Sequence, residues 1–340
     1  MKNCLLLIAL LVAPFVSFGA KLYVTNTNDT GAGSLRDQIT TASPGDTVFV
    51  DVAGTLMIAS QLDITKDLTI IGPGPIHFAI NGSNLSGLAA MLSPGGSSTV
   101  IIEGIKFESG IHHAIGTGSG YTGLVIVKNC LFEAINSTPV NIDGGNIEFE
   151  GCSFVDNLSA NEAGVCLFSG NAAKFTNCTF HNNDASFEGG ALHLSAGTID
   201  LINNTFLDNG QTMSGGTNAK AIHVGPAATL NLRNNIITQA SGSGINQIIF
   251  NNGGVINSQG GNVTRDNASG DWTPFGSDLV NTAVTLGSMV TDGWGLKYFP
   301  FADNASAGIN IDNNPIGLPL YEQRRVCRVL DVDTGFEYAD

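Results

Sequence analysis

The chain has 340 residues, of which 43 are glycine and only 13% are charged, and its net charge is −15. Nucleic acids and anionic membranes repel a strongly negative protein, so the charge argues against both as partners, while it permits cation binding. The high glycine content and the scarcity of charged residues are typical of stacked β-coils with tight turns.

Residues 1–19 have the pattern of a signal peptide. A positive charge at Lys2 precedes an apolar segment from Leu5 to Val16, and small residues follow it. This order of features is typical of an export signal, and the apolar segment is short for a membrane-spanning helix. We therefore expect an exported chain that has no membrane span once the signal has been removed.

The segment 21–50 predicts a strand, a short helix and a second strand. Ser34 is a favourable N-cap, and Leu35 and Ile39 place two apolar side chains one helical turn apart. The pair Pro44–Gly45 then ends the helix. We expect this amphipathic helix to lie across the open end of a β-structure, where it protects unpaired strands and apolar core.

A sequence repeat runs through the central part of the chain, and its length is about that of one coil of a solenoid. Segment 175–180, Phe-Thr-Asn-Cys-Thr-Phe, aligns with segment 201–206, Leu-Ile-Asn-Asn-Thr-Phe. The apolar residues that end each repeat fall 22 to 31 residues apart, and they are Phe107, Phe132, Phe154, Phe180, Phe206 and Ile237. The variable spacing predicts loops of different length on a core that keeps its register.

Each repeat has glycine or asparagine three residues before this apolar residue. These positions are Gly104, Asn129, Gly151, Asn177, Asn203 and Asn234. Glycine and asparagine accept a left-handed backbone at low cost, so we predict a one-residue bend at each position. Such a bend interrupts the alternation of a strand, so that the residues before and after it can both face inward.

A short apolar-x-apolar run opens each repeat, at residues 140–142, 165–167, 192–194 and 222–224. Three short strands per repeat, in register from one repeat to the next, predict an all-β fold, a single-stranded parallel β-helix with a short N-terminal capping helix. With this pattern the chain resembles the right-handed, pectate-lyase-like β-helix superfamily.

Three cysteines share one predicted inward column, and they are Cys130, Cys152 and Cys178. We interpret them as a stack of small core residues, with metal ligands or disulfide bridges as the alternatives. Five cysteines remain after the signal peptide, and an odd number is a poor disulfide framework. Asn157, Asn183 and Asn209 form a further column, interpreted as a hydrogen-bonded turn ladder, with a ligand role as the alternative.

Both ends of the chain carry further resemblances. Asn28–Arg36 and Pro44–Thr47 are similar to the opening of many exported bacterial β-helix proteins. Ala307–Ile311, Glu322–Arg324 and Val332–Tyr338 resemble the C-terminal signature of the choice-of-anchor Q family, although Glu322 stands where that family has aspartate. The family resemblance implies a secreted or cell-surface, outer-membrane-associated protein. We expect four segments, namely the signal peptide (1–19), the N-terminal cap and first strands (20–55), the β-helix repeats (56–250), and the terminal coils with a C-terminal cap (251–340).

In pectate-lyase-like β-helices the substrate lies along the outward face of the apolar-x-apolar strand. Here the middle positions of these runs are Asn141, Cys166, His193 and His223, and Asp184 and Glu188 lie on the loops that lead to them. The candidate ligand-binding residues of this face are His193, His223, Asn141, Glu188 and Asp184, with no metal site. The preferred interpretation of the column is a surface ladder of like residues without chemistry, and a ligand-binding face is the alternative.

The known chemistries of the superfamily fit this face poorly. Polysaccharide lyases need a strong base together with a cation, and the predicted face has no arginine or lysine. Inverting glycosidases need facing carboxylates, and motifs for a nucleophile, a phosphate loop or zinc are absent. We therefore predict a monomeric, non-catalytic protein without a cofactor, which presents a surface for adhesion or glycan binding, with room for a divalent cation. The alternative is a polysaccharide-active enzyme, a lyase more than a hydrolase.

Overall fold

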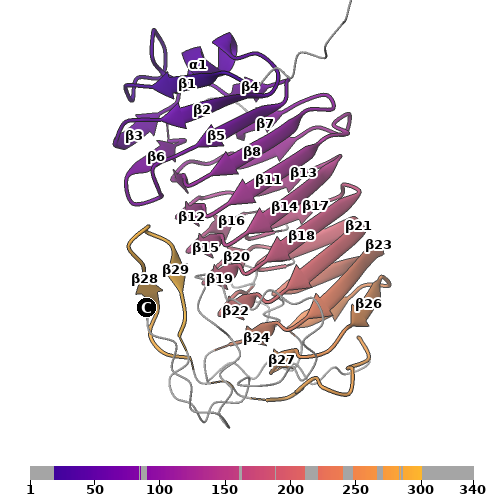
Figure 1. The fold of residues 1–340 in the computed structure, drawn as a ribbon. Coiled ribbons are helices and arrows are strands. Elements are labelled where there is room, and N and C mark those ends of the chain that lie inside the picture. Colours follow the sequence, from indigo (N-terminus) through magenta and orange to yellow (C-terminus); the bar gives the residue numbers. More distant parts are fainter. Residues whose placement is uncertain are drawn as a thin grey trace, which may run out of the picture.

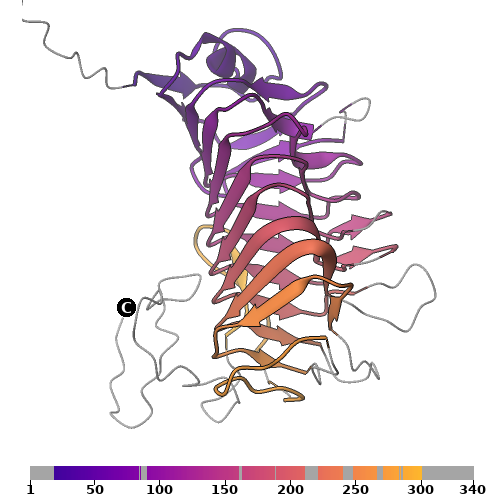
Figure 2. The ribbon, with the colours of Figure 1, turned by 90° about the vertical axis from the view of Figure 1, so that its right-hand side faces the viewer.

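The structure, a computed structural model, describes residues 19–83, 85, 90–160, 163–187, 189–210, 221–239, 248–265, 271–282, 284 and 286–300. Figure 1 shows coils of β-strands stacked along one axis, with the helix α1 at one end. Figure 2 shows the same stack after a turn of 90°. The predicted all-β parallel β-helix is confirmed, while the predicted signal peptide and the C-terminal family signature lie outside the described residues.

The largest sheet, here called sheet A, contains the first two strands of each coil. The first strands are β4 (Leu62–Ile64), β7 (Ala90–Pro94), β10 (His113–Thr117), β13 (Val140–Ile142), β17 (Cys166–Phe168) and β25 (Ile249–Asn251). The second strands are β1 (Lys21–Val24), β2 (Asp46–Val50), β5 (Leu68–Ile71), β8 (Thr99–Glu103), β11 (Leu124–Lys128), β14 (Asn146–Glu150), β18 (Ala172–Thr176) and β26 (Val255–Ser258). In β21 (Leu192–Ile202) and β23 (Ile222–Arg233) the two strands run on without a break.

A second sheet, sheet B, contains the third strand of each coil. Its members are β3 (Gly54–Met57), β6 (Phe78–Asn81), β9 (Lys106–Glu108), β12 (Leu131–Glu133), β15 (Ser153–Val155), β19 (Thr179–His181), β22 (Thr205–Leu207), β24 (Ile236–Thr238) and β27 (Val263–Thr264). Two pairs lie outside these sheets, the parallel pair β16 (Leu158–Ser159) and β20 (Asp184–Ala185), and the antiparallel hairpin β28 (Val290–Thr291) and β29 (Lys297–Tyr298).

The N-terminal helix α1 (Leu35–Thr41) caps the stack as predicted. The Ser34 hydroxyl accepts a hydrogen bond from the Asp37 amide at 3.2 Å, which satisfies one of the free amides at the helix start. Leu35 and Ile39 are buried in the core of the β-helix. At the other end, the Lys66 ammonium group donates to the Ala42 carbonyl at 2.6 Å, so a positive charge stabilises the helix C-terminus.

All six predicted bends have a left-handed backbone, with φ between 50° and 68°. Each bend joins the second strand of a coil to the third. Asparagine also adds a side-chain ladder, since Asn234 Nδ2 donates to Asn203 Oδ1 at 3.0 Å and Asn203 Nδ2 donates to Asn177 Oδ1. The bend therefore fixes both the direction of the chain and the register of neighbouring coils.

Replacing Asn203 with valine is expected to lower the free energy of unfolding by about 1–2 kcal/mol, because a β-branched residue resists positive φ. The measurement is a denaturant melt of the variant beside Lys174→Val, in which valine occupies an exposed position in strand β18. Equal stability of Asn203→Val and the parent protein would contradict this assignment of the bend.

The predicted cysteine column is confirmed, because Cys130, Cys152 and Cys178 are buried thiols outside any disulfide bond. Burial raises the pKa of the Cys130 and Cys152 thiols well above the usual value, so both remain neutral at pH 7. In the later coils the column continues with Asn204 and Asn235, whose side chains bond to each other and to the backbone of adjacent coils.

Replacing Cys178 with alanine is expected to lower the free energy of unfolding by about 1–2 kcal/mol, since a small cavity replaces the sulfur. Because the thiol is free, adding reductant is expected to leave the melting temperature of the parent protein unchanged. A melting temperature that falls sharply with reductant would show that a disulfide stabilises these coils.

Candidate functional site

The middle residues of the first strands form one line on the outer side of sheet A, here called the outward column. Parallel pairing places them beside one another on successive coils, in the order Gly116, Asn141, Leu167, His193, His223 and Phe250. Their strand neighbours point the other way, and Val140, Ile142, Leu192 and Leu194 are fully buried in the core. Alternation along a strand thus places a continuous row of side chains outside the β-helix.

Cys166 does not belong to this column, and its predicted outward position is wrong. It pairs with Val140 and Leu192 on the inward side and is fully buried, while Leu167 takes the outward position. The segment 165–168 is apolar throughout, so alternation alone does not fix its register. Burying the large Phe168 ring decides it and shifts the strand by one residue. Burial also raises the pKa of the Cys166 thiol, which is therefore neutral.

The two histidines face each other across adjacent coils, and their predicted pairing is confirmed. His193 and His223 are in register, with ring centroids 4.5 Å apart and an angle of 6° between the planes. Phe250 extends the stack, since its ring meets His223 edge-on at 5.3 Å. The exposure differs from the expectation, because His193 is half-buried and His223 is only 2% exposed. The histidine nearer to solvent is therefore His193.

Asn141 lies two coils before His193, with Leu167 between them. Its side-chain oxygen is shielded from solvent and accepts no hydrogen bond from the described residues. A shielded amide oxygen without a donor is costly unless water or a ligand supplies one. The column thus offers a hydrogen-bond acceptor and a ring stack on the same face.

Of the two predicted acidic residues, only Asp184 lies within the described part of the chain. Asp184 lies on β20, in the separate sheet with β16, and its amide donates to the Asn157 carbonyl at 2.9 Å. Glu188 lies outside the described residues. Within the described part of the chain, no group of three or more His, Cys, Asp or Glu side chains could hold a metal ion.

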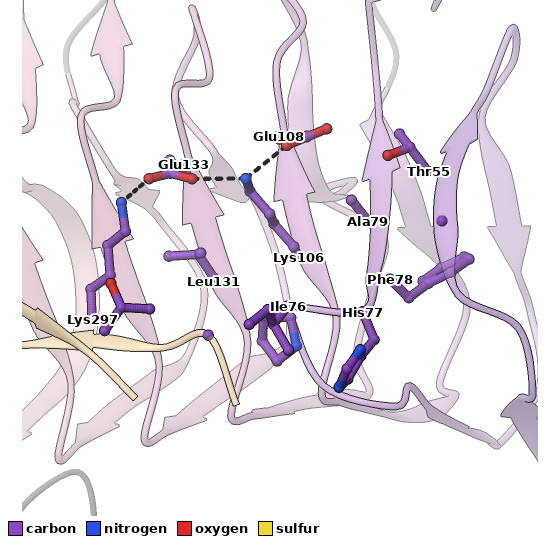
Figure 3. Close-up of a pocket in the computed structure, with 14 residues that line it drawn as sticks. Thr55, Ile76, His77, Phe78, Ala79, Lys106, Glu108, Leu131, Glu133 and Lys297 are labelled. Atoms are coloured by element: carbon purple, nitrogen blue, oxygen red, sulfur yellow. Dashed lines mark hydrogen bonds and ion pairs between the residues drawn. The ribbon is translucent and has the colours of Figure 1, made fainter. Parts of the chain in front are cut away.

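Sequence reasoning missed a second feature, a cavity of about 380 Å³ between sheet B and the β28–β29 hairpin, here called the hairpin cleft. Lys106 lies between two carboxylates, with its Nζ 2.8 Å from Glu108 Oε2 and 2.8 Å from Glu133 Oε2. Lys297 of the hairpin pairs with the other oxygen of Glu133 (Figure 3). The charges at 106, 108 and 133 flank the repeating phenylalanines, and this signal was available in the sequence.

The comparisons with known proteins agree with this architecture. The family described as "Right handed beta helix region" matches residues 92–268. The chain is also similar to "Probable pectate lyase C" of Aspergillus oryzae (strain ATCC 42149 / RIB 40). The two are 26% identical over 157 residues, which are 43% of this chain and 34% of that protein. The chain therefore spans about a third of the length of this curated relative.

Two solved structures match part of the chain, and both are of the PL6 family alginate lyase AlyGC, one of them a mutant. Sequence identity is 16% in each case, and the match covers 79% of this chain and 41% of the enzyme. The TM-scores are 0.48 for the mutant and 0.47 for the enzyme itself.

Proposed function

Because the chain belongs to the right-handed β-helix family, we propose that it is an exported protein that binds polysaccharide along the outward column. The observation that carries the proposal is the ring stack of His193, His223 and Phe250 on successive coils. A polymer with a regular repeat suits a face that also repeats from coil to coil. Ring faces and edges can pack against sugar C–H groups, while imidazole nitrogens can exchange hydrogen bonds with hydroxyls.

Of the two roles that the sequence predicts, the pectate lyase relative favours cleavage over adhesion without catalysis. Lyases cleave by β-elimination, in which a base removes the proton on the carbon that bears the carboxylate. The electrons of that bond form a carbon–carbon double bond, the C–O bond to the leaving sugar breaks, and the departing oxygen takes up a proton from water. We assign the base to His193, since imidazole nitrogens commonly act as general bases and the His193 ring is the more accessible of the pair.

A cleavage assay tests the catalytic part of the proposal. Purified protein is incubated with polygalacturonate, with alginate and with neutral polysaccharides, with and without calcium, while the ultraviolet absorbance of the new double bond is followed. Calcium is included because a cation neutralises the substrate carboxylate and so assists proton removal. We expect absorbance to rise with one acidic polysaccharide and to stop rising in His193→Ala. Binding without any absorbance change would assign the chain to adhesion instead.

We also propose a surface location and a terminus of choice-of-anchor Q type. The support is the sequence pattern at 307–338, which lies outside the described residues. None of the described helices is long and apolar enough to cross a membrane. Fractionating cells that express the full chain tests the location, and recovery of all the protein from the cytoplasm would contradict it.

A further inference from the structure

We propose that the hairpin cleft binds a neutral saccharide unit, with Trp294 as the ring on which the sugar packs. The cleft lies on sheet B, whereas the outward column lies on sheet A, so this inference does not rest on the function proposed above. Sheet B supplies Lys106, Glu108 and Glu133, and the hairpin supplies Lys297 (Figure 3). The two walls come from segments more than 160 residues apart in the sequence, as the Lys297–Glu133 pair shows.

The charges of the cleft favour a neutral ligand over an ion. Lys106 and Lys297 balance Glu108 and Glu133, so the four ionised groups sum to zero. Burial raises the pKa of Glu133, but hydrogen bonds from both lysines outweigh it and hold the pKa below its usual value. Burial lowers the pKa of Lys106, but its two carboxylate partners outweigh burial, so the pKa is raised above its usual value. The two lysines and two glutamates of the cleft therefore pair with one another, and the cleft has no net charge that would attract an anion or a cation.

The same groups form a rigid array of hydrogen-bonding atoms. An ammonium group has three donors, and the two ion pairs of Lys106 use two of them. The Glu108 Oε1 atom accepts from Asn81 at 3.3 Å and retains acceptor capacity. Alternating donors and acceptors match the vicinal hydroxyls of a sugar, each of which can donate and accept. A volume of about 380 Å³ is within the range of small-molecule sites.

Trp294 lies at the rim of the cleft, next to Gly295 of the lining, and we assign it the apolar half of the site. Trp294 is 58% exposed, so its ring is open to a ligand. The Trp294 carbonyl accepts from the amide of Ile76, a residue of the cleft wall, at 3.0 Å. Its ring lies over Gly74, where a Cβ atom would be 3.4 Å from the ring. An exposed ring beside polar groups suits a sugar, which has an apolar C–H face and a polar edge.

The turn that carries Trp294 is ordered before any ligand arrives. Asp292 Oδ1 accepts from the Trp294 amide at 2.9 Å and from the Leu296 amide at 3.0 Å. The hairpin is also attached to sheet B through Ser153, whose hydroxyl donates to the Lys297 carbonyl at 2.8 Å. These contacts hold the hairpin on the β-helix without any need for an exposed tryptophan. A preorganised site loses less entropy on binding.

Tryptophan fluorescence tests the proposal directly, because the chain has two tryptophans and Trp272 is only 6% exposed. The purified full chain is titrated with neutral hexasaccharides of glucose, xylose and mannose, and with a hexamer of galacturonate as the acidic comparison. We expect saturable quenching by at least one neutral hexasaccharide. Quenching is expected to disappear in Trp294→Ala, and to need at least about tenfold more sugar in Glu108→Gln, which loses one charged acceptor.

The matched control is Phe275→Ala, because Phe275 is also 58% exposed but its ring lies by Gly260 and not by Gly74 beside the cleft. It is expected to leave the titration unchanged. Binding of Trp294→Ala and Glu108→Gln is also followed by calorimetry, which does not depend on the fluorophore. No response to any neutral hexasaccharide, a response only to galacturonate, or calorimetric binding that both variants retain in full would overturn the proposal.

Discussion

Replacing Phe154 with alanine is expected to lower the free energy of unfolding by about 3–5 kcal/mol, the range for a buried phenylalanine. Phe154 is fully buried at the centre of a ring stack on sheet B. Its centroid lies 4.8 Å from that of Phe132 and 4.9 Å from that of Phe180, and both pairs are stacked face to face. Phe149 meets it edge-on at 5.3 Å. Because coils on both sides hold these rings in place, the cavity has little freedom to collapse.

Chemical denaturation followed by circular dichroism measures this effect. The control is Phe187→Ala, since the Phe187 side chain is 58% exposed and its loss is expected to change stability by no more than about 0.5 kcal/mol. A cost for Phe154→Ala as small as that of the control would mean that the rings do not form the core of the stack.

Replacing Asn183 with alanine is expected to lower the free energy of unfolding by about 3–4 kcal/mol. Asn183 Oδ1 accepts from the amide and the side chain of Asn157, at 3.2 and 2.8 Å. Asn183 Nδ2 donates to the Phe154 carbonyl at 3.0 Å and to Asn209 Oδ1 at 2.8 Å. The variant leaves a backbone amide and a carbonyl buried without these partners, and each such group costs about 1–3 kcal/mol.

The matched control for this variant is Asn171→Ala, at an exposed position in the same coil. In equilibrium melts, the free energies of unfolding of the two variants are expected to differ by at least about 2 kcal/mol, because buried unsatisfied groups are costly. If the two variants have the same free energy of unfolding, the buried asparagine ladder contributes no more to stability than an exposed turn does.

The sequence predicts features that depend on a single strict backbone or packing requirement. The bends at Asn177 and Asn203 were predictable because few residue types tolerate positive φ. The ladder of Asn157, Asn183 and Asn209 was predicted for a similar reason, since its spacing repeats with the coil. A second row of left-handed residues was missed, because it mixes Asp156, Asn182 and Asp208 with Ser109 and Ala134, which have no such preference.

Two parts of the candidate sites could not be predicted, for different physical reasons. The register of Cys166 depends on which of several adjacent apolar residues is buried, and packing of Phe168 decides it only in three dimensions. The hairpin cleft depends on Lys297 docking beside Glu133 and Ser153, through contacts between segments far apart along the chain. Local patterns carry no information about such a contact, whereas the repeat itself sets the position of the outward column.

Affinity electrophoresis through gels that contain polygalacturonate or alginate is the direct test of binding along the outward column. We expect at least one of these acidic polysaccharides to retard the parent protein, and His193→Ala to migrate as it does in a gel without polysaccharide. His181→Ala serves as the control, since that half-buried histidine lies on β19 of sheet B and is expected to leave retardation unchanged. Migration of the parent protein that no polysaccharide alters, or equal retardation of His193→Ala, would contradict binding along the outward column.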